Sequence, residues 1–163
     1  MNKELEFLQK NTSYLYNLYL LLKEIRGTYK SKMGEDLWKA LNSSVARNYL
    51  LGVAALLEPV KDSQGNENLS IHILGANINL SPYEDTIDKL RRFRRKAIAH
   101  NDKEVMLVGD SYFDTYELKP DEVEQLFEYM VECLAKVVEF PFPKKQLEER
   151  MLTQIRDFMG EDN

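Results

Sequence analysis

The sequence predicts an all-α fold, an up-and-down bundle of four to five helices, on three observations. Long segments place apolar residues at alternating steps of three and four, which is the spacing of one helical face. Glycine or proline marks the ends of several of these segments, and polar loop residues separate them. With 163 residues, 44% of them hydrophobic, the chain can bury a core as one domain, 1–163, whose bundle spans about 2–140.

The first predicted helix covers residues 2–26 and carries two apolar stripes. The first stripe consists of Leu5, Leu8, Thr12, Leu15, Tyr19 and Leu22. The second stripe consists of Phe7, Tyr14, Leu18, Leu21 and Ile25. Two stripes indicate a helix that is either buried over a wide face or shared between the core and a partner, and both interpretations stay open. Gly27 is expected to end this helix.

The second predicted helix covers residues 34–58, with Pro59 just beyond its end. Its buried face is expected to consist of Leu37, Ala40, Leu41, Ser44, Val45, Asn48, Leu51 and Ala55. Small residues along this helix, Gly52 among them, would let a neighbouring helix approach closely. Residues 61–68 read as a loop, and residues 68–80 are compatible with a short extended piece or a helical turn.

The third predicted helix begins at Ser81, which we expect to cap it, with Pro82 at the first helical position and Glu84 completing a capping box. Its expected buried side consists of Ile87, Leu90, Phe93, Ala97 and Ile98. Six of the eight residues from 89 to 96 are basic, namely Lys89, Arg91, Arg92, Arg94, Arg95 and Lys96. This helix therefore carries the strongest basic patch of the chain.

The rest of the chain adds two predicted helices. Residues 103–119 alternate in polarity and contain β-branched residues, which predicts a loop or a small hairpin. A fourth helix is predicted at 120–140, with Val123, Leu126, Phe127, Met130, Leu134, Val137 and Val138 on its apolar side. A C-terminal amphipathic helix is predicted at 144–159, and it either packs on the bundle or serves as a dimer arm.

The basic cluster has two interpretations. A guanidinium grips a phosphate in a bidentate way, and an imidazole exchanges a proton near neutral pH, so Arg95 and His100 together could support metal-independent cleavage of an RNA backbone. In an undisturbed helix these two side chains lie roughly 140° apart, so one chain alone would aim them poorly at the same phosphate. They could act together if the helix distorts or ends between them, or if a second copy of the chain supplies the missing partner. Alternatively, the arginines could merely form ion pairs with glutamates of the fourth helix, which recur every four residues as Glu124, Glu128 and Glu132.

The string Arg95-Lys96-Ala97-Ile98-Ala99-His100-Asn101-Asp102, late in a helix of a small helical chain, resembles the Arg-x4–6-His motif of HEPN domains. It is most similar to the AbiU-type, abortive-infection branch of that superfamily. The resemblance implies a helical bundle that forms a homodimer, in which two motifs face each other in one cleft. It also implies a metal-independent endoribonuclease, cofactor-free, in a toxin–antitoxin or phage-defence system, with an antitoxin protein as a further candidate partner.

The resemblance assigns roles to individual residues. Arg95 matches the motif arginine, which would stabilise charge on the phosphorane-like transition state, and His100 matches the motif histidine, which would transfer the proton. The residues expected to hold the RNA backbone are Arg91, Arg92 and Lys96. Asp102 either orients the imidazole, holds Arg95 or is simply a residue of the helix end.

Lys96 also supports the alternative function. Many active HEPN proteins carry Asn, Asp or His directly after the motif arginine, and this chain has Lys96 there. That difference favours a non-catalytic HEPN-like module, whose basic cleft binds nucleic acid, a nucleotide or an acidic partner protein. A third interpretation is a helical interaction protein without any such site.

Composition argues against three classes: broad nucleic-acid binders, metal-binding proteins and membrane-spanning proteins. The net charge of −5 argues against broad, non-specific nucleic-acid binding, so any RNA contact has to be local. A metal site is not expected, because the single Cys133 and two distant histidines offer no ligand spacing; Cys133 is expected to be buried. His72 is expected to be structural or on the surface. No apolar run approaches the ~20 residues that span a bilayer, which predicts a cytoplasmic protein without membrane contact.

Overall fold

The computed structural model of this chain describes residues 3–99, 111–138 and 144–160. Five long helices make up most of the described chain: α1 (Lys3–Arg26), α2 (Glu35–Leu56), α3 (Glu84–Ala99), α6 (Pro120–Val137) and α7 (Lys144–Met159). A short helix, α5 (Ser111–Thr115), precedes α6, and two 3-10 helices, η1 (Ile71–Asn77) and η2 (Ser81–Tyr83), precede α3. No strand occurs in the described ranges, so the prediction of a helical bundle is confirmed.

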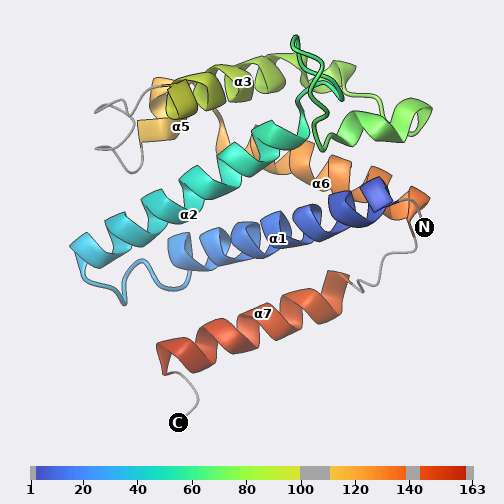
Figure 1. Ribbon diagram of the computed structural model, residues 1–163. Helices are drawn as coiled ribbons and strands as arrows, with labels where there is room; N and C mark the ends of the chain where they lie inside the picture. The colour runs from blue at the N-terminus through green and yellow to red at the C-terminus, as the bar shows by residue number, and fades with distance from the viewer. Residues whose placement is uncertain (1–2, 100–110, 139–143, 161–163) are drawn as a thin grey trace.

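Successive long helices run in alternating directions, which is the up-and-down arrangement expected from the sequence (Figure 1). α2 lies between α1 and α3 and contacts both, while α7 packs on α1. An aromatic cluster fills the centre, where the Phe127 ring of α6 lies 6.4 Å from Tyr16, 6.2 Å from Tyr19 and 5.4 Å from Tyr49. The core therefore joins α1, α2 and α6 directly.

The predicted helices agree with the structure, but the predicted buried face of α2 was only partly right, since Val45 is buried and Leu41, Leu51 and Ala55 are half-buried. Leu37 is 57% exposed, and Ser44 and Asn48 are also exposed. The residues that α2 buries are Trp38, Asn42, Val45, Ala46, Tyr49, Leu50, Val53, Ala54 and Leu56. Because α2 has a helix on each of two sides, its apolar surface is broader than one stripe, and the spacing alone did not identify the buried residues.

Two connections differ from their predictions. Ser81 was expected to cap the third helix, yet it begins η2 instead, and its backbone N–H donates to Asn79 Oδ1 at 3.2 Å. The region 103–119 was expected to be a loop or hairpin, but its residues 111–115 form α5. Residues 103–110 lie outside the described residues.

The structure decides between the two conformations, extended or helical, that the sequence allowed for residues 68–80. Residues 61–68 form a loop, as predicted, in which Asp62 accepts hydrogen bonds from the backbone N–H groups of Gln64 and Asn66. Residues 71–77 adopt two short 3-10 turns interrupted at Gly75, whose φ of 56° favours glycine. The helical alternative for this segment is thus the correct one.

At Gly52, α1 lies so close to α2 that there is no room for a side chain. A Cβ atom at Gly52 would lie 2.1 Å from Leu15 Cδ2, and Leu15 is only 4% exposed. We expect Gly52→Val to lower the free energy of unfolding by about 1–3 kcal/mol, since overpacking forces neighbours to move. Urea unfolding would measure this, with Ala40→Val on the exposed side of α2 as the control. Equal stability of the two variants would contradict the described packing.

Candidate functional site

The six basic residues of α3 divide into two groups, and the first group holds the fold together. Arg91 Nη2 donates to the carbonyl oxygen of Leu57 at 2.9 Å, and Arg94 Nη1 lies 2.6 Å from Glu58 Oε1. Lys89 pairs with Asp85 within α3. Arg91 and Arg94 therefore fasten α3 to the residues just beyond α2, where the helix dipole and the unpaired carbonyl groups attract cations.

The second basic group is exposed to solvent at the C-terminal end of α3. It consists of Arg92, Arg95 and Lys96. Neither Arg92 nor Arg95 forms an ion pair with another described residue, and Lys96 Nζ lies 5.9 Å from the centre of the Tyr116 ring. We name Arg92, Arg95 and Lys96 the basic end of α3.

The predicted ion pairs between α3 and α6 are not found among the described residues. The ion pair that α3 forms with another element joins Arg94 to Glu58, and Glu124 of α6 pairs with Lys23 of α1 at 3.0 Å instead. Ile98 was expected to be buried but is 64% exposed, so the last turn of α3 offers an apolar side chain beside the basic end. The other four predicted core residues of α3 are buried.

Two of the predicted site residues lie outside the described residues, namely His100 and Asp102. α3 is described as far as Ala99, which directly precedes His100. The structure thus places Arg92, Arg95 and Lys96 together, and it separates them from Arg91, whose guanidinium is engaged with Leu57 and lies 3.8 Å from Asp88.

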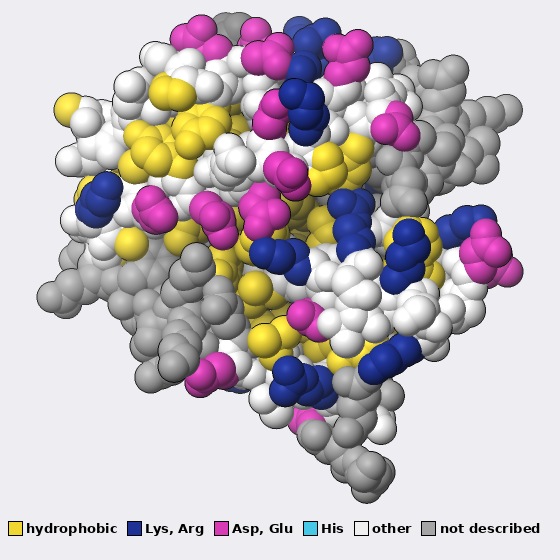
Figure 2. Space-filling view, turned by 180° about the vertical axis from the view of Figure 1, so that it is seen from behind, with side chains coloured by type: hydrophobic (Ala, Val, Ile, Leu, Met, Phe, Trp, Pro, Cys, Tyr) yellow, Lys and Arg dark blue, Asp and Glu magenta, His cyan; other side chains and the backbone are white. Residues whose placement is uncertain are grey.

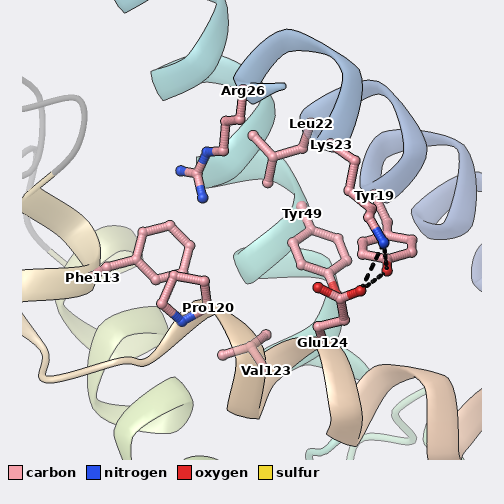
Figure 3. Close-up of a pocket in the computed structure, with 9 residues that line it drawn as sticks. All are labelled: Tyr19, Leu22, Lys23, Arg26, Tyr49, Phe113, Pro120, Val123 and Glu124. Carbon is pink, nitrogen blue, oxygen red and sulfur yellow. Dashed lines mark hydrogen bonds and ion pairs between the residues drawn. The ribbon is translucent and has the colours of Figure 1, made fainter. Parts of the chain in front are cut away.

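A pocket of about 220 Å³ opens between α1, α2, α6 and α5, and it was not predicted (Figure 3). Its lining residues are Tyr19, Leu22, Lys23, Arg26, Tyr49, Phe113, Pro120, Val123 and Glu124. Aromatic and aliphatic side chains form most of its wall, and a few charged groups converge on it. This combination is typical of small-ligand sites.

The charged groups of the pocket are held by hydrogen bonds. The Tyr19 hydroxyl donates to Glu124 Oε1, and Lys23 Nζ lies 3.0 Å from the same oxygen (Figure 3). Burial, and then the hydrogen bond to Glu124, raise the pKa of Tyr19, so this phenol stays protonated. Arg26 Nε donates to Asn42 Oδ1 at 2.7 Å, and the Arg26 guanidinium carbon lies 4.8 Å from the centre of the Phe113 ring.

Tyr49 is the unusual member of the pocket. Its side chain is 3% exposed, and its hydroxyl has no hydrogen-bond partner within the part of the chain that the structure describes. Burial raises the pKa of Tyr49 well above the usual value, with Tyr19 and Glu124 adding to the effect. The Tyr49 phenol is therefore protonated, and the residue lines the pocket while its hydroxyl oxygen is shielded from solvent.

Removing this hydroxyl is expected to stabilise the protein. An unsatisfied buried polar group costs roughly 1–3 kcal/mol, so Tyr49→Phe should raise the free energy of unfolding by about 1 kcal/mol. Tyr14→Phe is the matched control, because Tyr14 is 58% exposed and its hydroxyl can bind water. Chemical denaturation would compare the two variants with the wild type. A loss of stability in Tyr49→Phe would mean that its hydroxyl has a structural partner.

The pocket and the basic end of α3 are joined through the residues that include and follow α5. Phe113 lies against Arg26 in the pocket, and Tyr116 contacts both Phe93 and Lys96 of α3, with 5.3 Å between the Phe93 and Tyr116 ring centres. Two residues separate Phe113 from Tyr116, so one short segment contacts both features.

The predictions for Cys133 and His72 agree with the structure. Cys133 is buried, and His72 is exposed with Nε2 3.3 Å from the Leu57 carbonyl oxygen. No cluster of potential metal ligands occurs among the described side chains. Within the same residues, no helix is both long and apolar enough to cross a membrane. On the face in Figure 2, Lys and Arg are interspersed with Asp and Glu.

Comparisons with models of protein families, with curated proteins and with solved structures found no match to this chain.

Sequence reasoning missed the pocket because its lining residues come from four helices. The stripe on α1 that contains Tyr19 and Leu22 was read as core, and both residues are indeed buried, but they also line the pocket. One signal was available: Arg26 and Lys23 lie one turn apart at the end of an otherwise apolar stripe. That spacing alone does not distinguish a pocket from a solvated helix end.

Proposed function

We propose that this protein is a metal-independent endoribonuclease of the HEPN type, which acts as a homodimer in a toxin–antitoxin or phage-defence system. The observation that supports the proposal is the division of the basic residues of α3. Arg91 and Arg94 are engaged with the residues just beyond α2, whereas Arg95 is exposed together with Arg92 and Lys96 in the C-terminal half of α3, before His100. Metal-independent phosphate cleavage uses an accessible guanidinium and a proton-transferring group, and His100 follows Arg95 five positions later.

In the proposed reaction, the 2′-hydroxyl of RNA attacks the adjacent phosphorus. His100 accepts the hydroxyl proton or donates one to the leaving 5′-oxygen, and the bond between phosphorus and that oxygen breaks. The products are a 2′,3′-cyclic phosphate and a 5′-hydroxyl. Arg95 stabilises the charge on the phosphorane-like transition state, while Arg92 and Lys96 hold the neighbouring phosphates.

The dimer is part of the proposal because of helix geometry. Side chains five positions apart point roughly 140° away from each other on a regular helix. Two copies that bring their motifs together would place Arg95 of each chain beside His100 of the other. The exposed Ile98 on the same turn is an apolar side chain that such a contact would cover. Asp102 is a candidate to orient the imidazole.

The test is cleavage of a mixed RNA pool by the purified protein in EDTA, with the oligomeric state measured by light scattering. We expect cleavage by a dimer, and products that end in a cyclic phosphate. A monomer, or an intact RNA pool, would contradict the nuclease. RNA binding that moderate salt abolishes, without any cleavage, would instead support the non-catalytic module, for which the exposed cations of α3 provide the phosphate contacts.

A further inference from the structure

We propose that Arg47 of α2 binds a phosphate of the RNA strand, beside the phosphates that the basic end of α3 would hold. This inference rests on the proposed function and deepens it, because it adds a residue of a second helix to the RNA-binding surface. Three observations support it: Arg47 has no partner among the described residues, it lies on the side of α2 that faces α3, and the two helices separate at its level.

The Arg47 guanidinium lacks a counter-charge within the part of the chain that the structure describes. Its Nε is shielded from solvent without a hydrogen-bond partner, whereas its Nη groups are not shielded in this way and the side chain as a whole is half-buried. α2 offers no acidic neighbour, since no Asp or Glu occurs between Asp36 and Glu58, and Glu58 pairs with Arg94. A half-buried cation without a counter-charge is costly, which indicates that a ligand supplies the negative charge.

The position of Arg47 on α2 directs it toward α3. Gly52 marks the side of α2 that faces α1, because a Cβ atom there would clash with Leu15. At 100° per residue, Arg47 lies roughly 140° from Gly52 around the helix. It shares a stripe with Leu50 and Ala54, which are both fully buried. α2 lies between α1 and α3 and contacts both (Figure 1), so this stripe is on the α3 side.

α2 and α3 separate toward the C-terminal end of α3. Arg91, Arg94 and Ile98 follow one another at steps of three and four, so they lie on one face of α3. The two arginines contact Leu57 and Glu58, just beyond α2, whereas Ile98 is 64% exposed. The face of α3 that meets the end of α2 is therefore uncovered one turn later.

Arg47 lies near the level of this uncovered turn. α2 and α3 run in opposite directions, so the residues before Leu57 lie alongside those after Arg91 (Figure 1). Arg47 is ten positions before Leu57, which is about 15 Å along α2. Ala99 is eight positions after Arg91, which is about 12 Å along α3. Arg47 is thus about level with the end of the described part of α3.

The two helices together present the groups that hold a nucleic-acid backbone. Arg95 lies three positions before Ile98, on the adjoining side of the same uncovered turn, and it is exposed. Arg47 approaches this turn from α2. A guanidinium pairs with a phosphate in a bidentate way, and an RNA strand carries a negative charge on every nucleotide. Arg47 and Arg95 would therefore bind different phosphates of one strand.

The experiment is fluorescence anisotropy of a labelled RNA single strand whose 2′-hydroxyl groups are methylated, so that the strand can bind but cannot be cleaved. We expect Arg47→Met to weaken binding at least tenfold, the effect of losing a hydrogen bond between charged groups. The slope of log K against log salt should decrease in magnitude by about 0.7, the value for one phosphate contact with a single strand. Arg47→Lys should recover part of the affinity, because it keeps the charge but not the bidentate geometry.

Lys10→Met is the matched control, because it removes the same charge from an exposed position of α1. It should bind the strand like the wild type. The midpoint of urea unfolding of Arg47→Met should be no lower than that of the wild type, since the guanidinium has no described partner to lose. Equal affinity of Arg47→Met and Lys10→Met, a lower midpoint for Arg47→Met, or no binding by the wild type would overturn the inference.

A parallel assay with unmodified RNA separates this inference from the proposed nuclease. Cleavage by the wild type together with unchanged binding in Arg47→Met would refute the role of Arg47 alone. Binding that depends on Arg47, without any cleavage of unmodified RNA, would refute the nuclease alone and leave Arg47 as a phosphate-binding residue.

Discussion

Replacement of His100 by alanine is expected to slow RNA cleavage in EDTA by about 10²- to 10⁴-fold, the usual contribution of a general acid–base group. The physical reason is that an imidazole is the side chain suited to exchange a proton near neutral pH, whereas the basic end of α3 consists of two arginines and a lysine. Gel analysis of a labelled RNA pool would measure the rates. Circular dichroism and light scattering would show that the variant stays folded and dimeric.

Substitutions of Arg95 test the same site through the rate of RNA cleavage. Arg95→Ala should reduce cleavage by a factor similar to that for His100→Ala, because the guanidinium would no longer stabilise charge on the transition state. Arg95 is exposed in the described part of the chain. Arg95→Lys should recover only part of the rate, since an ammonium group keeps the charge but not the bidentate geometry. Stability should be unchanged in both variants within about 0.5 kcal/mol.

His72→Ala is the matched control for the histidine. His72 is exposed and far from the motif in sequence, and its ring Nε2 lies 3.3 Å from the Leu57 carbonyl oxygen. Its substitution should leave the cleavage rate at the wild-type value. If His100→Ala cleaved as fast as wild type while His72→Ala did not, the motif assignment would be wrong and the other histidine would carry the chemistry.

The helices could be predicted from the sequence because their signals are local. The spacing of apolar residues, Gly27 and Pro59 located α1 and α2 to within two residues, and Pro120 located the beginning of α6. The buried face of α2 could not be predicted in the same way. Its position between two other helices is a tertiary property. Trp38, for example, is buried against α1, where its indole N–H donates to the Ile25 carbonyl oxygen.

The beginning of α3 shows how tertiary contacts override a local motif. The residues around Ser81 match a capping box, yet the Asn79 N–H donates to the hydroxyl of Tyr129, and Tyr83 packs its ring 5.4 Å from that of Tyr129. These contacts come from α6, about fifty residues away in sequence. They fix the chain in a 3-10 turn before the α-helix begins, which the sequence pattern alone could not reveal.

The candidate site could be predicted only in part for the same reason. The sequence identified the basic cluster of α3, but it could not tell that Arg91 and Arg94 meet Leu57 and Glu58, more than thirty positions earlier. Because Arg91 and Arg94 are engaged in this way, Arg92, Arg95 and Lys96 are the exposed basic residues of α3 that remain as candidates for phosphate binding. The pocket depended still more on tertiary structure, because Tyr49 and Glu124 are apart in sequence and lie together only when α2 and α6 pack.

Replacement of Phe127 by alanine is expected to have the largest effect on stability. Phe127 is fully buried, and its ring packs against those of Tyr16, Tyr19 and Tyr49. The variant loses the transfer free energy of the ring and leaves a cavity, so the free energy of unfolding should fall by about 3–5 kcal/mol. This is a large part of the 5–15 kcal/mol that stabilises a typical domain. Urea denaturation followed by circular dichroism would measure the loss.

Phe158→Ala on α7 is the control, because the Phe158 side chain is 86% exposed, and its substitution should change stability by less than about 0.5 kcal/mol. Comparable values for the two variants would contradict the aromatic core. Because the Phe127 ring lies 5.4 Å from Tyr49, its loss should also allow the Tyr49 ring to move. Phe127→Ala and Tyr49→Phe should then be non-additive in stability, since the stabilisation expected from Tyr49→Phe requires that the phenol is held away from water by Phe127.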